Sequence, residues 1–111
     1  MNLHHIPFLA GLDDASANAI AANMISLAIP GGRQLFAQGE EGDGLYTLIS
    51  GSIGISTRDP LTNAVHRIAR LHPPETIGEM ALLSAAPRSA TATALRDSHV
   101  LRLTRTAFEA V

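Results

Sequence analysis

The sequence has 111 residues, enough for one domain with a modest core and too few for an additional catalytic domain. Hydrophobic residues form 46% and charged residues 16% of the chain, and the net charge is −2, which favours a globular protein and argues against general attraction to DNA or anionic lipid. The absence of cysteine excludes disulfides, thiolate metal sites and cysteine nucleophiles, and it suits a cytoplasmic protein.

Residues 4–24 are expected to form an N-terminal helical segment. Pro7 is tolerated in a first helical turn, and the Asp13-Asp14 pair offers an N-cap for a helix over Ala15–Met24. A weak apolar stripe at helical spacing predicts that this helix packs on the side of a larger unit. The residues of the stripe are Leu12, Ala15, Ala19 or Ile20, and Met24.

The first part of the chain shows no targeting or membrane signal. No Lys or Arg precedes Arg33, so the basic start of a signal peptide is missing. The longest apolar run, Ala19–Pro30, contains polar residues and is too short to span a bilayer. We therefore expect a cytoplasmic location and no membrane partner.

From residue 25 onwards the pattern changes to short β-type runs that are separated by turn residues. Seven or eight short strands joined by tight turns predict a mainly β fold with flanking helices, built as an antiparallel barrel or jelly roll. The expected strands are Ser26–Ile29, Gln34–Ala37, Leu45–Ser50, Ser52–Thr57, Val65–Leu71, Thr91–Ala94 and His99–Leu103.

The run Val65–Leu71 alternates poorly, because Arg67 shares a face with Val65 and Leu71. Either a β-bulge or a two-faced strand, without one buried and one open face, would explain this pattern, and the sequence leaves both open. Beyond the last strand, Thr104 is expected to cap a helix that begins at Arg105.

Residues 76–93 carry the features that indicate a binding site. Gly78 frees the backbone, and Met80–Leu83 has good helix propensity but is too short for more than about one turn. Such a turn leaves its first amide groups unpaired, which makes a small anion site. Glu79 can accept hydrogen bonds from hydroxyls and Arg88 can clamp phosphate oxygens. The segment therefore predicts a ligand that has both hydroxyls and a phosphate.

This segment resembles the phosphate-binding cassette of the cyclic nucleotide-binding domain family, in which Phe-Gly-Glu-x-Ala-Leu is followed by Arg-x-Ala. The pattern stands here as Ile77-Gly78-Glu79-Met80-Ala81-Leu82 and Arg88-Ser89-Ala90, with Ile77 in place of the aromatic residue. The Gly39 turn and the Gly51 step also resemble the family's glycine-punctuated front half, so the resemblance covers nearly all of the chain.

The resemblance implies a β-roll of the double-stranded β-helix type and one domain over residues 1–111. Residues 1–24 would be the N-terminal helical segment, residues 25–103 the β-roll with its cassette at 77–90, and residues 104–111 the start of a C-terminal helix. Family members usually continue into a longer helix that covers the base. We therefore expect the chain to be an N-terminal regulatory domain that binds its ligand more weakly than the parent protein.

The resemblance also implies the roles of individual residues. Arg88 would face the exocyclic oxygens of a cyclic phosphate, and Glu79 would bind the ribose 2′-hydroxyl. The alternatives are a surface arginine, and a glutamate that pairs with Arg88 or caps the turn. The side chains of Met80, Leu82 and Leu83 are expected to fill the core. The expected binding residues are Gly78, Glu79, Met80, Ala81, Leu82, Arg88, Ser89 and Ala90.

Apolar residues of the strands that precede the cassette are expected to line the base, or otherwise to be plain core: Ile55, Ile68 and Leu71. The five histidines do not have metal-ligand spacing, so no metal site is expected. No nucleophile elbow or phosphate-transfer loop is present, so we expect no catalytic residues and no enzyme activity.

These features lead to one expectation with two alternatives. The chain would bind a cyclic nucleotide, cAMP in preference to cGMP, as the sensor of a larger signalling protein with an effector domain or as a homodimer, without binding nucleic acid directly. One alternative is a degenerate domain that serves dimerisation or docking. The other is the N-terminal regulatory domain of a hydrolase such as a patatin-like lipase, which the cassette also resembles.

Overall fold

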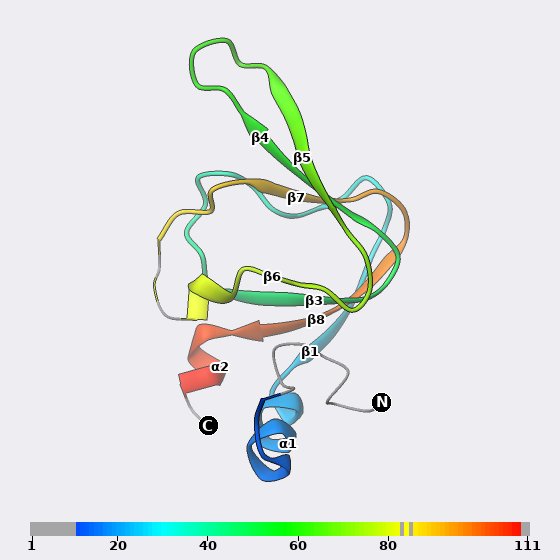
Figure 1. The fold of residues 1–111 in the computed structure, drawn as a ribbon, viewed down its shortest axis with the longest axis vertical. Coiled ribbons are helices and arrows are strands. Elements are labelled where there is room, and N and C mark those ends of the chain that lie inside the picture. Colours follow the sequence, from blue (N-terminus) through cyan, green and yellow to red (C-terminus); the bar gives the residue numbers. More distant parts are fainter. Residues whose placement is uncertain (1–10, 83, 85, 110–111) are drawn as a thin grey trace.

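Two antiparallel β-sheets enclose the main core (Figure 1). The structure is a computed structural model that describes residues 11–82, 84 and 86–109. One sheet has the strand order β1-β8-β3-β6 and the other has β2-β7-β4-β5. The strands are β1 (Ile25–Ile29), β2 (Gln34–Phe36), β3 (Gly44–Ser50), β4 (Ile53–Arg58), β5 (Val65–Leu71), β6 (Thr76–Ile77), β7 (Thr91–Ala94) and β8 (Ser98–Thr104).

Strands that follow each other in the chain mostly belong to different sheets, so the antiparallel jelly roll expected from the sequence is confirmed. All seven expected strands form, two of them, Val65–Leu71 and Thr91–Ala94, with the expected bounds. The additional strand β6 pairs Thr76 with Thr47 and Ile77 with Tyr46. The sequence did not predict this strand, because two residues are too few to show an alternating pattern.

The main core fills the space between the sheets. Tyr46, Leu48 and Val100 enter it from one sheet, and the opposite sheet contributes buried residues from β2, β4 and β7. The latter are Phe36, Ile53, Ile55, Ala92 and Ala94. Inward-facing residues that alternate along each strand produce this arrangement.

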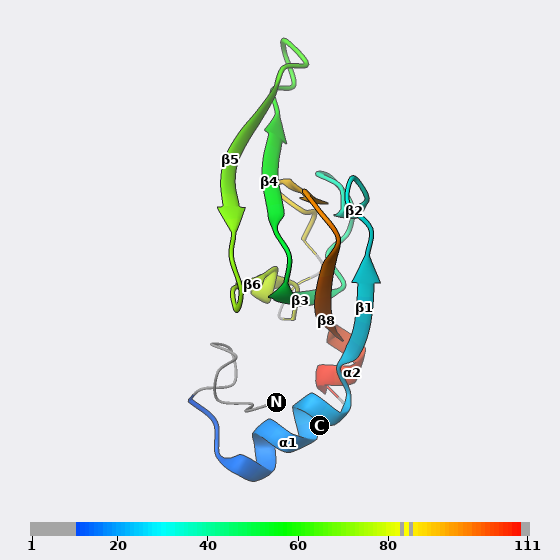
Figure 2. The same cartoon turned by 90° about the vertical axis from the view of Figure 1, so that its right-hand side faces the viewer.

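Helix α1 (Asp14–Ala22) packs outside the sheets (Figure 2). Asp13 caps it, accepting a hydrogen bond from the Ser16 amide at 3.1 Å, as the Asp13-Asp14 pair predicted. The helix ends at Ala22 rather than at Met24. The expected stripe is corrected at one position, since Ala15 is exposed and Ala17 is buried instead. The part of the predicted helical segment before residue 11, with Pro7, lies outside the described residues.

A second cluster joins both ends of the described chain to the outer face of the β1-β8-β3-β6 sheet. Its buried members include Ile20 of α1, Leu45 of β3 and Leu103 of β8, and Ala107 of helix α2 (Arg105–Glu109) packs against it. Thr104 caps α2 as expected, because its hydroxyl accepts from the Ala107 amide at 3.1 Å. None of the helices among the described residues is long and apolar enough to cross a membrane.

The β4–β5 hairpin projects beyond the body of the fold (Figures 1 and 2). The register shifts between Ile55, opposite Ala69, and Ser56, opposite Arg67, which leaves Ile68 as an extra residue in β5. Every residue of β5 before Leu71 is exposed. Both explanations for the poor alternation of Val65–Leu71 therefore apply, because the strand has a bulge and is also exposed on both faces.

Candidate functional site

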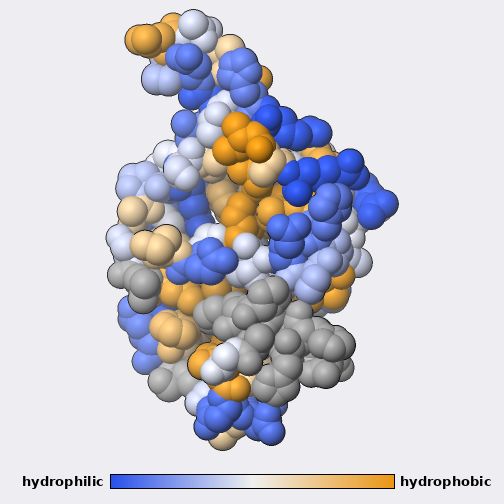
Figure 3. Space-filling model, in the orientation of Figure 1, coloured by the Kyte–Doolittle hydropathy of each residue, from blue (hydrophilic) through white to orange (hydrophobic). Residues whose placement is uncertain are grey.

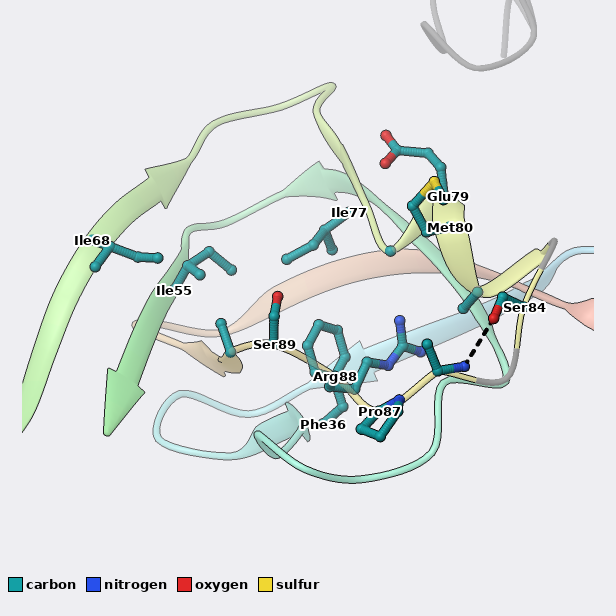
Figure 4. A pocket seen from close by; sticks show the side chains of 14 residues that line it. Phe36, Ile55, Ile68, Ile77, Glu79, Met80, Ser84, Pro87, Arg88 and Ser89 are labelled. Atoms are coloured by element: carbon teal, nitrogen blue, oxygen red, sulfur yellow. Dashed lines mark hydrogen bonds between the residues drawn. The ribbon is translucent and has the colours of Figure 1, made fainter. Parts of the chain in front are cut away.

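A cavity of about 320 Å³ opens beside the segment singled out in the sequence (Figure 4). One wall comes from β4 and β5, and a second from β6 and the 3₁₀ turn η3 (Glu79–Leu82), with the loop that precedes β7 opposite. Figure 3 shows an apolar area in the hollow on this face, flanked by hydrophilic side chains. The lining residues are Phe36, Ile55, Ile68, Ile77, Gly78, Glu79, Met80, Ala81, Ser84, Ala86, Pro87, Arg88, Ser89 and Ala90.

Arg88 is the buried charge of this cavity, with only 8% of its surface exposed. Its Nη2 donates to the Gly44 carbonyl oxygen at 2.8 Å and lies 3.5 Å from the Asp43 carboxylate. Its Nε is also buried and has no hydrogen-bond partner. A buried guanidinium with an unused donor is costly unless something else satisfies it, so this side chain favours an anionic ligand.

The Arg88 backbone is held by the turn before β3. The Arg88 amide donates to the Glu40 carbonyl at 2.7 Å, and the Arg88 carbonyl accepts from the Gly39 amide at 2.8 Å. Glu41 and Pro87 form an isolated antiparallel bridge beside these bonds. The loop that presents the guanidinium is therefore fixed by main-chain bonds to a distant part of the sequence.

The aromatic ring of Phe36 lies against the Arg88 guanidinium, whose Cζ is 4.2 Å from the ring centroid. Phe36 is itself buried, and its ring lies 5.9 Å from that of Tyr46, measured between centroids. Arg88 is thus held between a ring of the core and the main chain at the start of β3.

Gly78 provides the space for this arginine on the side of η3. A Cβ atom at position 78 would lie 2.5 Å from Nη1 of Arg88, and the backbone has a φ of +88°. Both observations require glycine, the first because of contact and the second because of conformation. The first hydrogen bond of the turn runs from the Ala81 amide to the Gly78 carbonyl, so the amides of Glu79 and Met80 precede it and need other partners.

Glu79 is exposed at the mouth of the cavity, and its carboxylate points away from Arg88 (Figure 4). Among the described ion pairs, Arg88 is paired with Asp43 and not with Glu79. Asp43 is shared, since its carboxylate also forms an ion pair and hydrogen bond with Arg102. The expected alternative of a Glu79–Arg88 pair is therefore not what the structure contains, and Glu79 is available to solvent.

The structure brings most of the expected binding residues to one cavity and separates two of them from it. Leu82 points into the cluster with Ile20 and Leu45, and Leu71 packs against the main core. Met80 corrects an expectation, because it is 70% exposed at the cavity instead of filling the core. Leu83 lies outside the described residues. The residues that line the cavity as expected are Gly78, Glu79, Met80, Ala81, Arg88, Ser89, Ala90, Ile55 and Ile68.

Five residues of the lining and one residue behind it were not among the expected binding residues: Phe36, Ile77, Ser84, Ala86 and Pro87 in the lining, and Asp43 behind it. Ser84, whose hydroxyl accepts from the Ala86 amide at 3.2 Å, and Pro87 lie within the segment already singled out, so their proximity was a usable signal. Phe36 and Asp43 lie far from Arg88 in the sequence, where their local patterns indicate only a strand residue and a turn residue. Within the part of the chain that the structure describes, no group of three His, Asp or Glu side chains could hold a metal ion.

Comparisons with known proteins agree on the kind of domain. Residues 26–111 match the family described as cyclic nucleotide-binding domain. A CRP-like cAMP-activated global transcriptional regulator of Mycobacterium tuberculosis is 28% identical over 87% of this chain and 43% of its own length. An NTE family protein of the same organism is 29% identical over 96% of this chain and 17% of its own length.

Among solved structures, the N-terminal domain of a transcriptional regulator from Streptomyces coelicolor superposes with a TM-score of 0.87. It is 31% identical, and the match covers 97% of this chain and 76% of that one. The chain therefore spans less than half the length of the two curated relatives but most of the solved N-terminal domain.

Proposed function

Because the chain belongs to the cyclic nucleotide-binding domain family, we propose that its cavity binds a cyclic nucleotide, with cAMP preferred over cGMP. The observation that carries this proposal is the buried Arg88 guanidinium, a cation that lines the cavity and is held in place by the Gly44 carbonyl. The size of the cavity, about 320 Å³, falls in the range of small-ligand pockets, roughly 300 to 1,000 Å³.

The cyclic phosphate would lie between Arg88 and the start of η3. The Arg88 guanidinium would donate to a phosphate oxygen, and the amides of Glu79 and Met80 would donate from the opposite side. Ala81, which is small and lines the cavity, permits close approach of the phosphate to the main chain. This arrangement supports an anion held by local groups in a protein whose net charge is −2.

The ribose and base would occupy the remaining parts of the cavity. Glu79 at the mouth can accept a hydrogen bond from the ribose 2′-hydroxyl, which a solvent-exposed carboxylate does without losing an existing ion pair. Ile55, Ile68 and Met80 offer apolar surface to the base. The Ser89 hydroxyl, which lines the cavity, would contact the phosphate or the base edge.

The preference for cAMP rests on Ser89 and on the curated relative. Ser89 follows the cassette arginine, as a serine does in bacterial-type cAMP sensors of this family, and the M. tuberculosis relative is named as cAMP-activated. We propose the same ligand for this chain.

We further propose that the domain is a sensor within a larger signalling protein. Leu82 of η3 lies in the same cluster as Ile20 of α1 and Leu103 of β8, and Phe108 of α2 packs against that cluster. A ligand that favours one position of η3 would therefore also favour one position of the helices, by a population shift limited to the difference in ligand affinity between states. Helices α1 and α2 would be the moving parts.

The relatives are compatible with two kinds of process that the ligand-bound domain would regulate. The regulator from M. tuberculosis supports transcription control, and the NTE family protein supports the regulation of a hydrolase. In both cases this domain would sense the ligand and the remainder of the protein would act. A helix-turn-helix in the parent sequence would support the first output, and a Gly-x-Ser-x-Gly motif would support the second.

Calorimetric titration tests the proposal. cAMP and cGMP are titrated into the wild-type protein, into Arg88→Leu, and into Arg33→Leu as a control at an exposed arginine outside the cavity. We expect cAMP to bind the wild type and the control equally, and Arg88→Leu to lose about 2 to 5 kcal/mol of binding free energy. Absence of binding of either nucleotide to the wild type would favour a degenerate docking domain instead.

A further inference from the structure

We propose that Phe36 is a positioning residue that holds Arg88 in the plane required by the phosphate. This inference rests on the proposed function, since it concerns the same site. Phe36 lies on β2, far from the cassette in sequence, and nothing in the cassette pattern includes it. Its ring centroid is 4.2 Å from Cζ of Arg88, a separation at which the guanidinium is attracted by the face of the ring.

The ring is rigid because the core holds it. Phe36 is 7% exposed and belongs to the cluster between the two sheets. Tyr46 packs on it with a ring-centroid distance of 5.9 Å and an interplanar angle of 37°. A guanidinium that lies on this ring therefore takes its orientation from the core of the domain instead of from its own flexible side chain.

The polar partners of Arg88 do not by themselves fix the orientation of the guanidinium plane. The Gly44 carbonyl and the Asp43 carboxylate both contact Nη2, so they fix one corner of the guanidinium. They cannot prevent rotation of the plane about that corner. The ring of Phe36 against one face and the backbone at Gly78 beside Nη1 remove that freedom.

The consequence is preorganisation. With Nη2 engaged and one face covered by the ring, Nε is left with no partner inside the protein. A phosphate that enters the cavity meets a guanidinium that is already buried and oriented, so little side-chain entropy remains to be lost on binding. An aliphatic residue of similar size at position 36 would fill the core and would lose this effect.

The test compares Phe36→Leu with Phe36→Tyr and Phe36→Trp by calorimetric titration with cAMP. Leucine fills much of the same volume without an aromatic face, whereas tyrosine and tryptophan keep one. We expect Phe36→Leu to bind cAMP about tenfold more weakly and at least one aromatic variant to restore the affinity. Ile53→Val, a core substitution outside the cavity lining, controls for a general loss of stability and should bind like the wild type.

A second readout does not need the ligand. In NMR spectra of the free protein, the δ-methylene and Nε proton signals of Arg88 should be shifted by the ring of Phe36, and Phe36→Leu should remove that shift while Ile53→Val keeps it. If cAMP does not bind to the wild type, the proposed function fails, and these ligand-free signals still test the stacking. Equal cAMP affinity of Phe36→Leu and wild type, or Arg88 signals unaffected by Phe36→Leu, would overturn the inference.

Discussion

Replacement of Gly78 by alanine perturbs the site at a single atom and can be matched by an internal control. The new Cβ would lie 2.5 Å from Nη1 of Arg88, whereas ordinary carbon contacts lie at about 3.5 to 4.0 Å. The guanidinium must therefore move by about 1 Å, away from the Phe36 ring and the Gly44 carbonyl, or the backbone must shift. Gly32 has a φ of +90°, close to the +88° of Gly78, but a Cβ there would meet nothing within 4 Å.

The difference between the two variants isolates the contact with Arg88. Both should lose about 1 to 2 kcal/mol of unfolding free energy from the positive φ. Gly78→Ala should lose roughly 2 kcal/mol more, because it displaces a buried, charge-assisted hydrogen bond. It should also weaken cAMP binding by about 30-fold or more, as expected when an arginine–phosphate contact worth at least about 2 kcal/mol is lost.

Urea denaturation and calorimetric titration of Gly78→Ala and Gly32→Ala measure these two quantities. Gly32→Ala should keep the wild-type affinity for cAMP. Equal destabilisation of the two variants together with equal cAMP affinity would refute the assignment of Gly78 as the residue that makes room for Arg88.

Three further predictions concern the helix cap, the second cluster and the ribose. Hydrogen bonds from the Ser16 side chain and amide lower the pKa of Asp13 below its ordinary value of 3.8. The charged carboxylate therefore stabilises the fold fully above that pH, and this stabilisation is lost as the pH falls through the lowered pKa. Between about pH 5 and pH 2 the melting temperature of Asp13→Asn should fall less than that of the wild type, and parallel curves would contradict this. Leu45 is fully buried, so Leu45→Ala should cost about 2 to 5 kcal/mol in chemical denaturation, whereas Leu61→Ala at a 94% exposed site should cost almost nothing. If Glu79 binds the ribose, Glu79→Gln should weaken cAMP binding while changing the affinity for 2′-deoxy-cAMP far less; equal losses for both ligands would remove Glu79 from that role.

The expected fold was largely accessible from sequence because the information was local. Each strand is a short β-type run between turn residues, and the caps Asp13 and Thr104 precede their helices directly. The two-residue strand β6 was missed because its pairing with β3 depends on the partner strand and not on its own pattern. The exposure of Met80 likewise depends on which side of η3 faces the cavity, which a four-residue turn does not reveal.

The chemistry of the candidate site could be predicted from the sequence, but the residues that hold Arg88 in place could not. Gly78, Glu79 and Arg88 lie in one short segment, so their residue types indicated a ligand with a phosphate and hydroxyls. The groups that hold Arg88 come from β2, from the turn before β3 and from the first residue of β3, whose carbonyl is 44 positions away in the sequence. No spacing rule connects such distant residues, so the positions of Phe36 and Asp43 required the folded chain.

A crystal structure of the domain grown with saturating cAMP tests the central claim most directly. We expect a phosphate oxygen of cAMP to accept a hydrogen bond from the guanidinium of Arg88, with the phosphate beside the first amides of η3 and the base against Ile55 and Ile68. A structure in which the cavity stays empty at saturating cAMP, or in which the nucleotide binds elsewhere and makes no contact with Arg88, would contradict the account.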